Sequence, residues 1–409
     1  MNPLRHFLHD LAALPPDLKL LAVSLFAWAS GESLFIYIIP LYLKQLGATP
    51  VQIGNVASLA AVASACTMIP AGLLTDRWGP KRVLSYGWLV GVATGGFMAL
   101  AWNLPTFALG WIAYSLTLFV IPPVASYAIA GRGALPPERA LTMTSAGYAL
   151  GNVISPAVGG WIAEEFGLRS LFAIGTMLFA ISTVVLHFVR PQPVTRAAAG
   201  GDFRGLLANR RFVGFCLLTL GVWIVLWLGI PLAPNYLADV RGLTVAQVNR
   251  LGSFNALGWV VLGLVLGRRP PRRAFLIAQG FVMLYLLILL RTPWTGLIAV
   301  AFFARGAIYV SHSLVNAQAT RVVEPSQWGL AFGVLETVAW IGAVVAPLLA
   351  GRLYEIQPAL PFQLGLVLLP LALLVTYLFA PRPQALARGP SAEATQTGAA
   401  SGDAEAVGG

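Results

Sequence analysis

Residues 72–82 have the sequence GLLTDRWGPKR, a short charged turn between two apolar runs, and residues 263–273 have the related sequence GLVLGRRPPRR. The two stretches are 191 residues apart. The same offset relates five other pairs along the chain: Pro40 and Pro231, Gly151 and Gly342, Pro156 and Pro347, Gly160 and Gly351, and Glu164 and Glu355. Residues 47–52 (GATPVQ) and 242–247 (GLTVAQ) also match, with a drift of four residues that a short insertion explains. This nearly constant offset predicts two similar halves.

The composition indicates that both halves lie in a membrane. Of the 409 residues, 58% are hydrophobic and only 10% are charged, whereas soluble domains carry about 25% charged residues. Uncharged runs recur from about residue 20 to residue 380, each near the ~20 residues that a membrane-spanning α-helix needs. The net charge of +11 would favour nucleic acid only if the basic side chains shared one water-facing surface. They lie instead in short loops, so we expect no nucleic-acid partner.

Charges, proline and glycine clusters, and run lengths predict an all-α membrane protein of twelve transmembrane helices in two pseudo-symmetric six-helix bundles. The expected helices lie near residues 19–43, 52–74, 83–102, 105–130, 140–163, 169–189, 212–236, 246–266, 274–291, 294–320, 328–352 and 361–380. The domains are then a cytoplasmic N-terminal segment (1–18), the first bundle (19–190), a cytoplasmic central loop (191–211), the second bundle (212–380) and a tail (381–409). Small and polar residues dominate the tail, so we expect it to be disordered and cytoplasmic.

Basic residues orient the helices, because Lys and Arg are retained on the cytoplasmic side of a membrane. Nineteen of the 26 basic residues lie in the N-terminal segment, alternate loops and the tail, and six lie on the opposite side. We therefore expect a multi-pass protein of the cytoplasmic membrane with both termini in the cytoplasm. The first apolar run, which contains Glu32, matches a short cleavable signal peptide poorly, so we expect it to remain as a helix.

The charged turn carries a resemblance to a known family. It resembles the signature loop of the major facilitator superfamily at six positions, although Pro80 stands where the family usually has a basic residue: Gly72, Asp76, Arg77, Gly79, Lys81 and Arg82. Glycines let two helices approach closely, and Asp76 can accept hydrogen bonds from a neighbouring helix N-terminus or pair with basic residues. The resemblance implies a transporter that works by alternating access. It also implies that this loop holds the cytoplasmic side closed in the outward-open state.

A second motif lies in the fifth expected helix. It resembles a motif associated in this family with proton-coupled antiporters, with Ser155 in place of a glycine: Gly147, Gly151, Ser155, Pro156, Gly159 and Gly160. Small residues every four positions make a smooth face for tight packing, and Pro156 adds a bend. The motif therefore favours export in exchange for protons. Helix packing with no bearing on direction is the alternative.

Four ionisable side chains lie inside expected helices: Glu32, Arg305, His312 and Glu336. Such groups are costly in a bilayer unless they face a cavity or a partner, so each is a candidate for function. The resemblance implies that the first, fourth, seventh and tenth helices line a central cavity. Arg305 and His312 are seven residues apart, which places both on one helix face. His312 and Glu336 come out at similar depth, so we expect a direct or water-mediated pair.

These groups suggest a proton-coupling site. A carboxylate in a low-dielectric environment can exchange a proton near neutral pH, so our hypothesis is that Glu32 or Glu336 carries the coupled proton. Arg305 can instead bind an anionic group of the substrate. Ion pairs that only fix helix positions remain the alternative for all four residues.

Aromatic and amide side chains on the cavity helices can contact a partly apolar solute: Trp28, Tyr37, Tyr114, Trp223, Trp227, Tyr309 and Asn316. Roles in helix packing or in an interfacial aromatic belt remain open for each. Cys66 and Cys216 match neither a disulfide framework nor a metal-ligand spacing, and we expect no metal and no cofactor.

The sequence thus predicts a secondary transporter that moves a small-molecule substrate, with proton-coupled efflux of amphipathic or drug-like compounds as the leading function. Proton-coupled import of a sugar or an organic anion is the close alternative. A membrane receptor or scaffold without transport is an alternative of another class. Motifs of intramembrane enzymes and nucleotide-binding loops are absent from the sequence, so we do not expect an enzyme. We expect a monomer whose partners are the substrate, protons and the lipid bilayer.

Overall fold

The computed structural model describes residues 13–192, 203–324 and 327–381, and the regular elements in that part of the chain are all helices. The first half contains α2 (Pro16–Phe35), α3 (Ile39–Gln45), α4 (Pro50–Trp78), α5 (Pro80–Leu100), α6 (Leu104–Ser115), η1 (Leu116–Val120), α7 (Ile121–Ala130), α8 (Pro137–Phe166) and α9 (Leu168–His187). A short α10 (Phe203–Ala208) precedes the second half. That half contains α11 (Arg210–Trp227), η2 (Ile230–Leu232), α12 (Ala233–Asp239), α13 (Val245–Leu266), α14 (Pro271–Arg291), α15 (Thr295–Arg305), α16 (Ala307–Ala319), α17 (Trp328–Ile356) and α18 (Leu360–Phe379).

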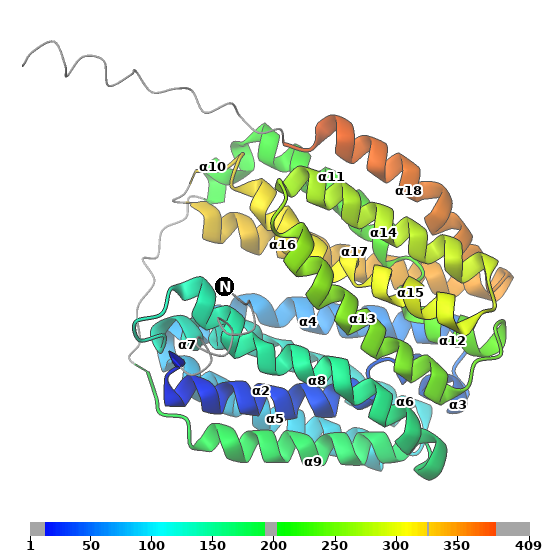
Figure 1. Cartoon of the computed structure of the whole chain (residues 1–409), viewed down its shortest axis with the longest axis horizontal. Coiled ribbons are helices and arrows are strands. Elements are labelled where there is room, and N and C mark those ends of the chain that lie inside the picture. Colours follow the sequence, from blue (N-terminus) through cyan, green and yellow to red (C-terminus); the bar gives the residue numbers. More distant parts are fainter. Residues whose placement is uncertain (1–12, 193–202, 325–326, 382–409) are drawn as a thin grey trace, which may run out of the picture.

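These elements confirm the predicted fold class. Among the described residues they make twelve long segments, counting α2 with α3, α6 with η1 and α7, α11 with η2 and α12, and α15 with α16. Eleven of these segments are long and apolar enough to span a membrane. The remaining one, α8, has 30 residues and contains the small and polar residues of the fifth-helix motif, which lower its hydropathy. Figure 1 shows the two halves as two layers of helices.

Four segments that we predicted as continuous helices are interrupted. The breaks fall at residues 36–38, at η1, at residues 228–232 and at Gly306, in the first, fourth, seventh and tenth segments. Pro40 and Pro231, which the repeat relates, both lie at these breaks, where proline removes a backbone donor. Irregular backbone at membrane depth is tolerated only inside protein or beside water. The breaks therefore mark the segments that lie in the interior.

Other boundaries also differ from the prediction. The helices α4, α8 and α17 extend beyond the predicted ranges at one end or both, because hydropathy falls before the helix ends. Within the predicted central loop the structure adds α10, while residues 193–202 lie outside the described residues. The predicted tail lies outside them from residue 382, and so do residues 1–12 of the N-terminal segment. The division into these domains remains a prediction.

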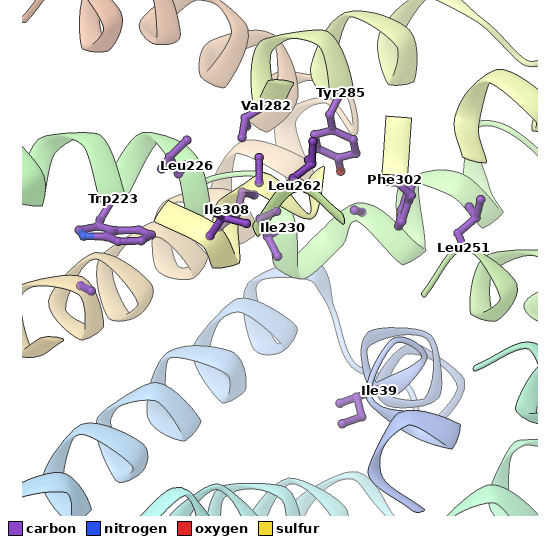
Figure 2. Close-up of a cluster of buried hydrophobic side chains, with 14 of the residues drawn as sticks. Ile39, Trp223, Leu226, Ile230, Leu251, Leu262, Val282, Tyr285, Phe302 and Ile308 are labelled. Carbon is purple, nitrogen blue, oxygen red and sulfur yellow. The ribbon is translucent and has the colours of Figure 1, made fainter. Parts of the chain in front are cut away.

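Each half has its own aromatic core. In the first half Trp28 stacks on Phe179 at 4.4 Å between ring centroids, and Trp88 Nε1 donates to Ser182 Oγ at 2.6 Å and to Ser24 Oγ at 3.1 Å. Figure 2 shows the core of the second half, where Trp223, Leu226, Leu262, Val282, Tyr285, Phe302 and Ile308 come from α11, α13, α14, α15 and α16. Ile39 of α3 lies apart from them in the same view. Such packing makes each half a compact unit.

The halves meet along two pairs of helices, α4 with α17 and α8 with α13. Glycines bring the backbones together: a Cβ on Gly160 would lie 2.8 Å from Ala246 O, and one on Gly351 would lie 2.8 Å from Pro50 O. Gly160 and Gly351 are a repeat pair, and each packs on the first turn of a helix that follows a capping box, at Thr244 and Thr49 respectively. The repeat in the sequence therefore reappears as two equivalent contacts between the halves.

Polar contacts between the halves gather at the same end. Lys44 Nζ lies 2.5 Å from Asp239 Oδ1, and Val51 N donates to Glu355 Oε1 at 3.4 Å. In the equivalent position Thr244 Oγ1 donates to Glu164 Oε1 at 3.0 Å. This end, which we name the contact end, contains α3 and α12, whereas α7 and α10 lie at the opposite end (Figure 1). The structure therefore shows a conformation in which the halves are joined at the contact end.

Candidate functional site

Glu32 lies in α2 against the small-residue face of α8. Tyr148 Oη donates to Glu32 Oε2 at 2.9 Å, and one residue further on Ser33 Oγ donates to Asn152 Oδ1 at 2.7 Å. The Glu32 side chain keeps partial exposure although most of α2 is buried. Tyr148 was missed by the sequence analysis, because the only signal was a polar residue beside Gly147. The buried face of α2 thus presents a carboxylate that is partly exposed.

Glu336 lies in a second cluster, in the other half. His312 Nδ1 lies 3.2 Å from Glu336 Oε2, and Asn316 Nδ2 donates to Glu336 Oε1 at 3.3 Å. The His312 ring packs on Trp223 with 4.2 Å between ring centroids. The side chains of His312 and Glu336 are 28% and 38% exposed, so solvent reaches them. The structure therefore joins directly the two residues that we expected to lie at similar depth.

Arg305 ends α15 and is only 5% exposed. Its guanidinium carbon lies 5.0 Å from the centroid of the Phe302 ring, and its Nε has no hydrogen-bond partner. Gly306 separates α15 from α16, so Arg305 and His312 lie on two successive helices, and their sharing of one face stays a prediction. Arg305 lies near Tyr285 and Tyr37, whereas His312 contacts α11 and α17.

The predicted cavity contacts divide into two groups. Trp28, Tyr114 and Trp223 are buried, at 4%, 2% and 1% exposure, and Trp223 packs on the His312 ring, so contact of these three with a solute stays a prediction. Tyr37, Trp227, Tyr309 and Asn316 are partly exposed. Tyr309 packs against the rings of Trp227 and Trp259, with centroids 6.4 and 5.8 Å away. Contact of this second group with a solute also stays a prediction.

The signature loop lies at the end opposite the contact end. Gly79 takes φ = 83° between α4 and α5, a backbone conformation that favours glycine. Lys81 Nζ donates to His187 O at 3.0 Å. Asp76 is exposed and makes no hydrogen bond within the described part of the chain, and a Cβ on Gly72 would meet nothing within 4 Å. The latching role of Asp76 remains a prediction.

The fifth-helix motif lies where α8 touches both halves. A Cβ on Gly147 would lie 2.1 Å from Ala22 O, and one on Gly151 would lie 2.8 Å from Phe26 O, both in α2. A Cβ on Gly159 would lie 2.7 Å from Asn249 Nδ2 of α13. Ser155 is buried, and Pro156 lies inside the helix. The motif thus packs α8 between α2 and α13. Tyr148, which follows the first glycine of the motif, donates to Glu32.

Two six-helix bundles with ionisable side chains on their interrupted helices define a membrane transporter built from a parallel repeat. The chain belongs to the major facilitator superfamily: the model described as Major Facilitator Superfamily matches residues 21–310 and 212–404. It is therefore a multi-pass membrane transporter and not an enzyme.

Individual relatives agree with this assignment. The chain is 25% identical over 355 residues to the multi-drug resistance efflux pump PmrA of Streptococcus pneumoniae, covering 79% of this chain and 85% of the pump. It is 21% identical over 375 residues to multidrug resistance protein 1 of Bacillus subtilis, covering 88% and 95% of the two chains. The crystal structure of the nucleoside transporter NupG has a TM-score of 0.71 at 15% identity, covering 89% of this chain and 98% of that one. At this identity the likeness to NupG shows the fold alone.

Proposed function

We propose that this transporter exports small amphipathic compounds across the cytoplasmic membrane in exchange for protons. The observation that supports it is a pair of partly exposed, hydrogen-bonded carboxylates within the helices, Glu32 and Glu336, one in each half. Both termini lie in the cytoplasm in this proposal, so the contact end faces outward and the structure is the inward-facing conformation.

Alternating access follows from the symmetry of the contacts between the halves. Rocking of the bundles about the central site parts α4 from α17 and α8 from α13 at the contact end, and closes the opposite end. There Asp76 meets the N-terminus of a neighbouring helix, where a negative charge is stabilised. The same movement changes the solvation of the central carboxylates.

Proton coupling then rests on the energetics of a carboxylate in a changing environment. An ionised carboxylate is stabilised by water and by hydrogen-bond donors such as Tyr148 and Asn316, and is destabilised when these are withdrawn. Protonation therefore favours the conformation in which the group is more enclosed. A substrate that occupies the same site in alternation with protons is exported as protons enter.

Export is favoured by two observations. Relatives across most of the chain are named as drug-efflux proteins. The fifth-helix motif, which resembles that of proton-coupled antiporters, packs directly against the helix that carries Glu32. Import of an organic anion is the second candidate, and buried Arg305 favours it.

The test is transport by purified protein in proteoliposomes. Flux of a cationic dye (ethidium) and an anionic dye (carboxyfluorescein) is followed with and without an imposed pH gradient. We expect gradient-driven flux that Glu32→Gln or Glu336→Gln abolishes, while Glu165→Gln, at an exposed position at the end of α8, retains it. Unchanged coupled flux in both carboxylate variants refutes the assignment. Absence of flux for a wider solute panel supports a receptor or scaffold instead.

The orientation of the chain in the membrane is tested by labelling in intact cells. Cysteines introduced at Trp102 and Phe188, which are 75% and 66% exposed at opposite ends, report sidedness through an impermeant maleimide. In intact cells we expect labelling at position 102 and protection at position 188. The reverse pattern contradicts the orientation that the basic residues predict.

A further inference from the structure

Arg305 is a buried cation without an anionic partner. It is 5% exposed, and no carboxylate of the described residues lies within ion-pair distance of it. Nor does the guanidinium donate a hydrogen bond to any described residue, and its Nε is fully enclosed. A buried unpaired charge is strongly destabilising, so such a group is retained where an anion is supplied from outside the chain.

Two tyrosine hydroxyl groups are also free to donate, that of Tyr37 and that of Tyr309, which follows Arg305 by four residues. Asn255 Nδ2 donates to Tyr37 Oη at 3.1 Å, so the oxygen of Tyr37 accepts and its own hydrogen is left free. Tyr37 lies within electrostatic range of both Tyr309 and Arg305. The Tyr309 hydroxyl has no hydrogen bond within the described structure, and its side chain is partly exposed. The guanidinium and the two hydroxyls are thus three donors that lack an acceptor among the described residues.

The surroundings of these donors are aromatic. Phe302 lies under the Arg305 guanidinium, and the Tyr309 ring contacts Trp259 at 5.8 Å and Trp227 at 6.4 Å between centroids. Trp227, Trp259 and Tyr309 are all partly exposed, so a ligand can reach their rings. A ligand that fits both features has an acidic group at one end and an apolar, preferably aromatic, body.

We propose that Arg305, Tyr37 and Tyr309 bind the acidic group of an amphipathic organic acid and that Trp227 and Trp259 contact its apolar body. Guanidinium geometry matches the two oxygens of a carboxylate, and each hydroxyl adds a charge-assisted hydrogen bond. This inference rests on the proposed function, because it names the class of compound that the central site carries. The substrate site then includes Tyr37, between α2 and α3 of the first half, and residues of α15 and α16 in the second half.

The experiment compares a matched pair of probes, 2-naphthoate and 2-naphthamide, by thermal unfolding of the full chain in detergent. A ligand that binds the folded state raises the midpoint with a concentration dependence that gives its affinity. We expect naphthoate to stabilise the wild type and naphthamide to leave it unchanged. Arg305→Gln should raise the apparent Kd for naphthoate about 10- to 150-fold, because the variant loses a charged hydrogen-bonding partner for the carboxylate.

Controls separate binding from folding. Arg291→Gln removes an exposed guanidinium at the end of α14 and should leave the naphthoate response intact. Without ligand, Arg305→Gln should unfold at an equal or higher temperature than the wild type, because an unpaired buried charge is gone. If Arg305 only stabilised the fold, the variant would unfold at a lower temperature than the wild type. If Arg305→Gln does not fold, Tyr309→Phe removes one donor, keeps the charge and should still weaken naphthoate binding.

Three results would overturn the proposal: no stabilisation by naphthoate at millimolar concentration, equal stabilisation by naphthamide, or an undiminished naphthoate response in Arg305→Gln. The measurement uses no membrane and no gradient, so it is independent of proton coupling. Naphthoate binding that depends on Arg305, together with flux that ignores Glu32→Gln and Glu336→Gln, would refute the coupling mechanism and leave this site standing.

Discussion

Gly54→Ala should shift the protein away from the conformation seen here. Gly54 lies in the first turns of α4, where a Cβ would come within 2.4 Å of Pro347 O and 3.3 Å of Gly351 Cα on α17. Backbone atoms cannot rotate away as a side chain can, so the added methyl must push the two helices apart. In the alternating-access mechanism that we propose, α4 and α17 separate at this end in the opposite conformation, which gives the methyl room.

The size of the effect follows from the overlap. Restoring a contact of 3.0 to 3.4 Å from 2.4 Å requires a displacement of 0.6 to 1.0 Å (3.0 − 2.4 and 3.4 − 2.4) along a well-packed interface. Overpacking of this kind typically costs about 1–3 kcal/mol. A cost that falls on one of two conformations changes their population ratio by about 5- to 150-fold.

Spin labels on both sides of the contact end measure this ratio. Cysteines replace Trp102 and Trp294, which are 75% and 66% exposed in the α5–α6 and α14–α15 connections. The native cysteines, Cys66 and Cys216, are first removed. Distances from double electron–electron resonance should show a longer population growing in Gly54→Ala. Gly214→Ala on α11, where a Cβ meets nothing within 4 Å, is the matched control.

A distance distribution that stays the same in Gly54→Ala and Gly214→Ala, at equal thermal stability, would refute the reasoning. If Gly54→Ala fails to fold, Gly351→Ala introduces a smaller steric overlap at the same interface, since its Cβ would lie 2.8 Å from Pro50 O. It should lengthen the same distance to a smaller degree.

Three further predictions concern the packing and the signature loop. Gly147→Val places a Cβ 2.1 Å from Ala22 O and should lower the free energy of unfolding by about 1–3 kcal/mol, whereas Gly221→Val, with open space, should not; thermal unfolding of the pair decides. Trp88→Phe removes the indole donor to the buried hydroxyls of Ser182 and Ser24, so we expect the free energy of unfolding to fall by about 1–3 kcal/mol. A thermal stability equal to that of the wild type would show that the two serine hydroxyls satisfy each other. Asp76→Asn should change the stability of this conformation by about 0.5 kcal/mol or less, because Asp76 is exposed, and should still slow transport severalfold; wild-type turnover would refute its latching role.

The helices themselves were predictable because membrane insertion depends on local composition. Runs of about twenty apolar residues have few alternatives to a helix in a bilayer, so the segments could be counted from hydropathy. Their ends were less predictable, since capping at Thr49 and proline at the first turn of α4 set a boundary that hydropathy does not show. The interruptions at residues 36–38 and at Gly306 were missed, because a helix pattern continues through them in the sequence.

The partners of the central ionisable residues were only partly predictable. Glu336 and His312 were paired by counting depth along two helices joined by one short connection, and they lie 3.2 Å apart. Glu32 meets Tyr148, which is 116 residues away, and no periodicity relates the two. Arg305 and His312 lie on two successive helices, α15 and α16, and the junction at Gly306 was not predictable from helix periodicity.

The sequence by itself determined that this protein crosses the membrane many times in two related halves, because burial in lipid and an internal repeat are both properties of consecutive residues. Only the tertiary structure decided which end of the two halves is joined and which buried charge lacks a partner. The rotation of each helix about its axis sets the neighbours of Glu32 and Arg305, and that rotation results from glycine contacts and backbone breaks distributed over the whole chain.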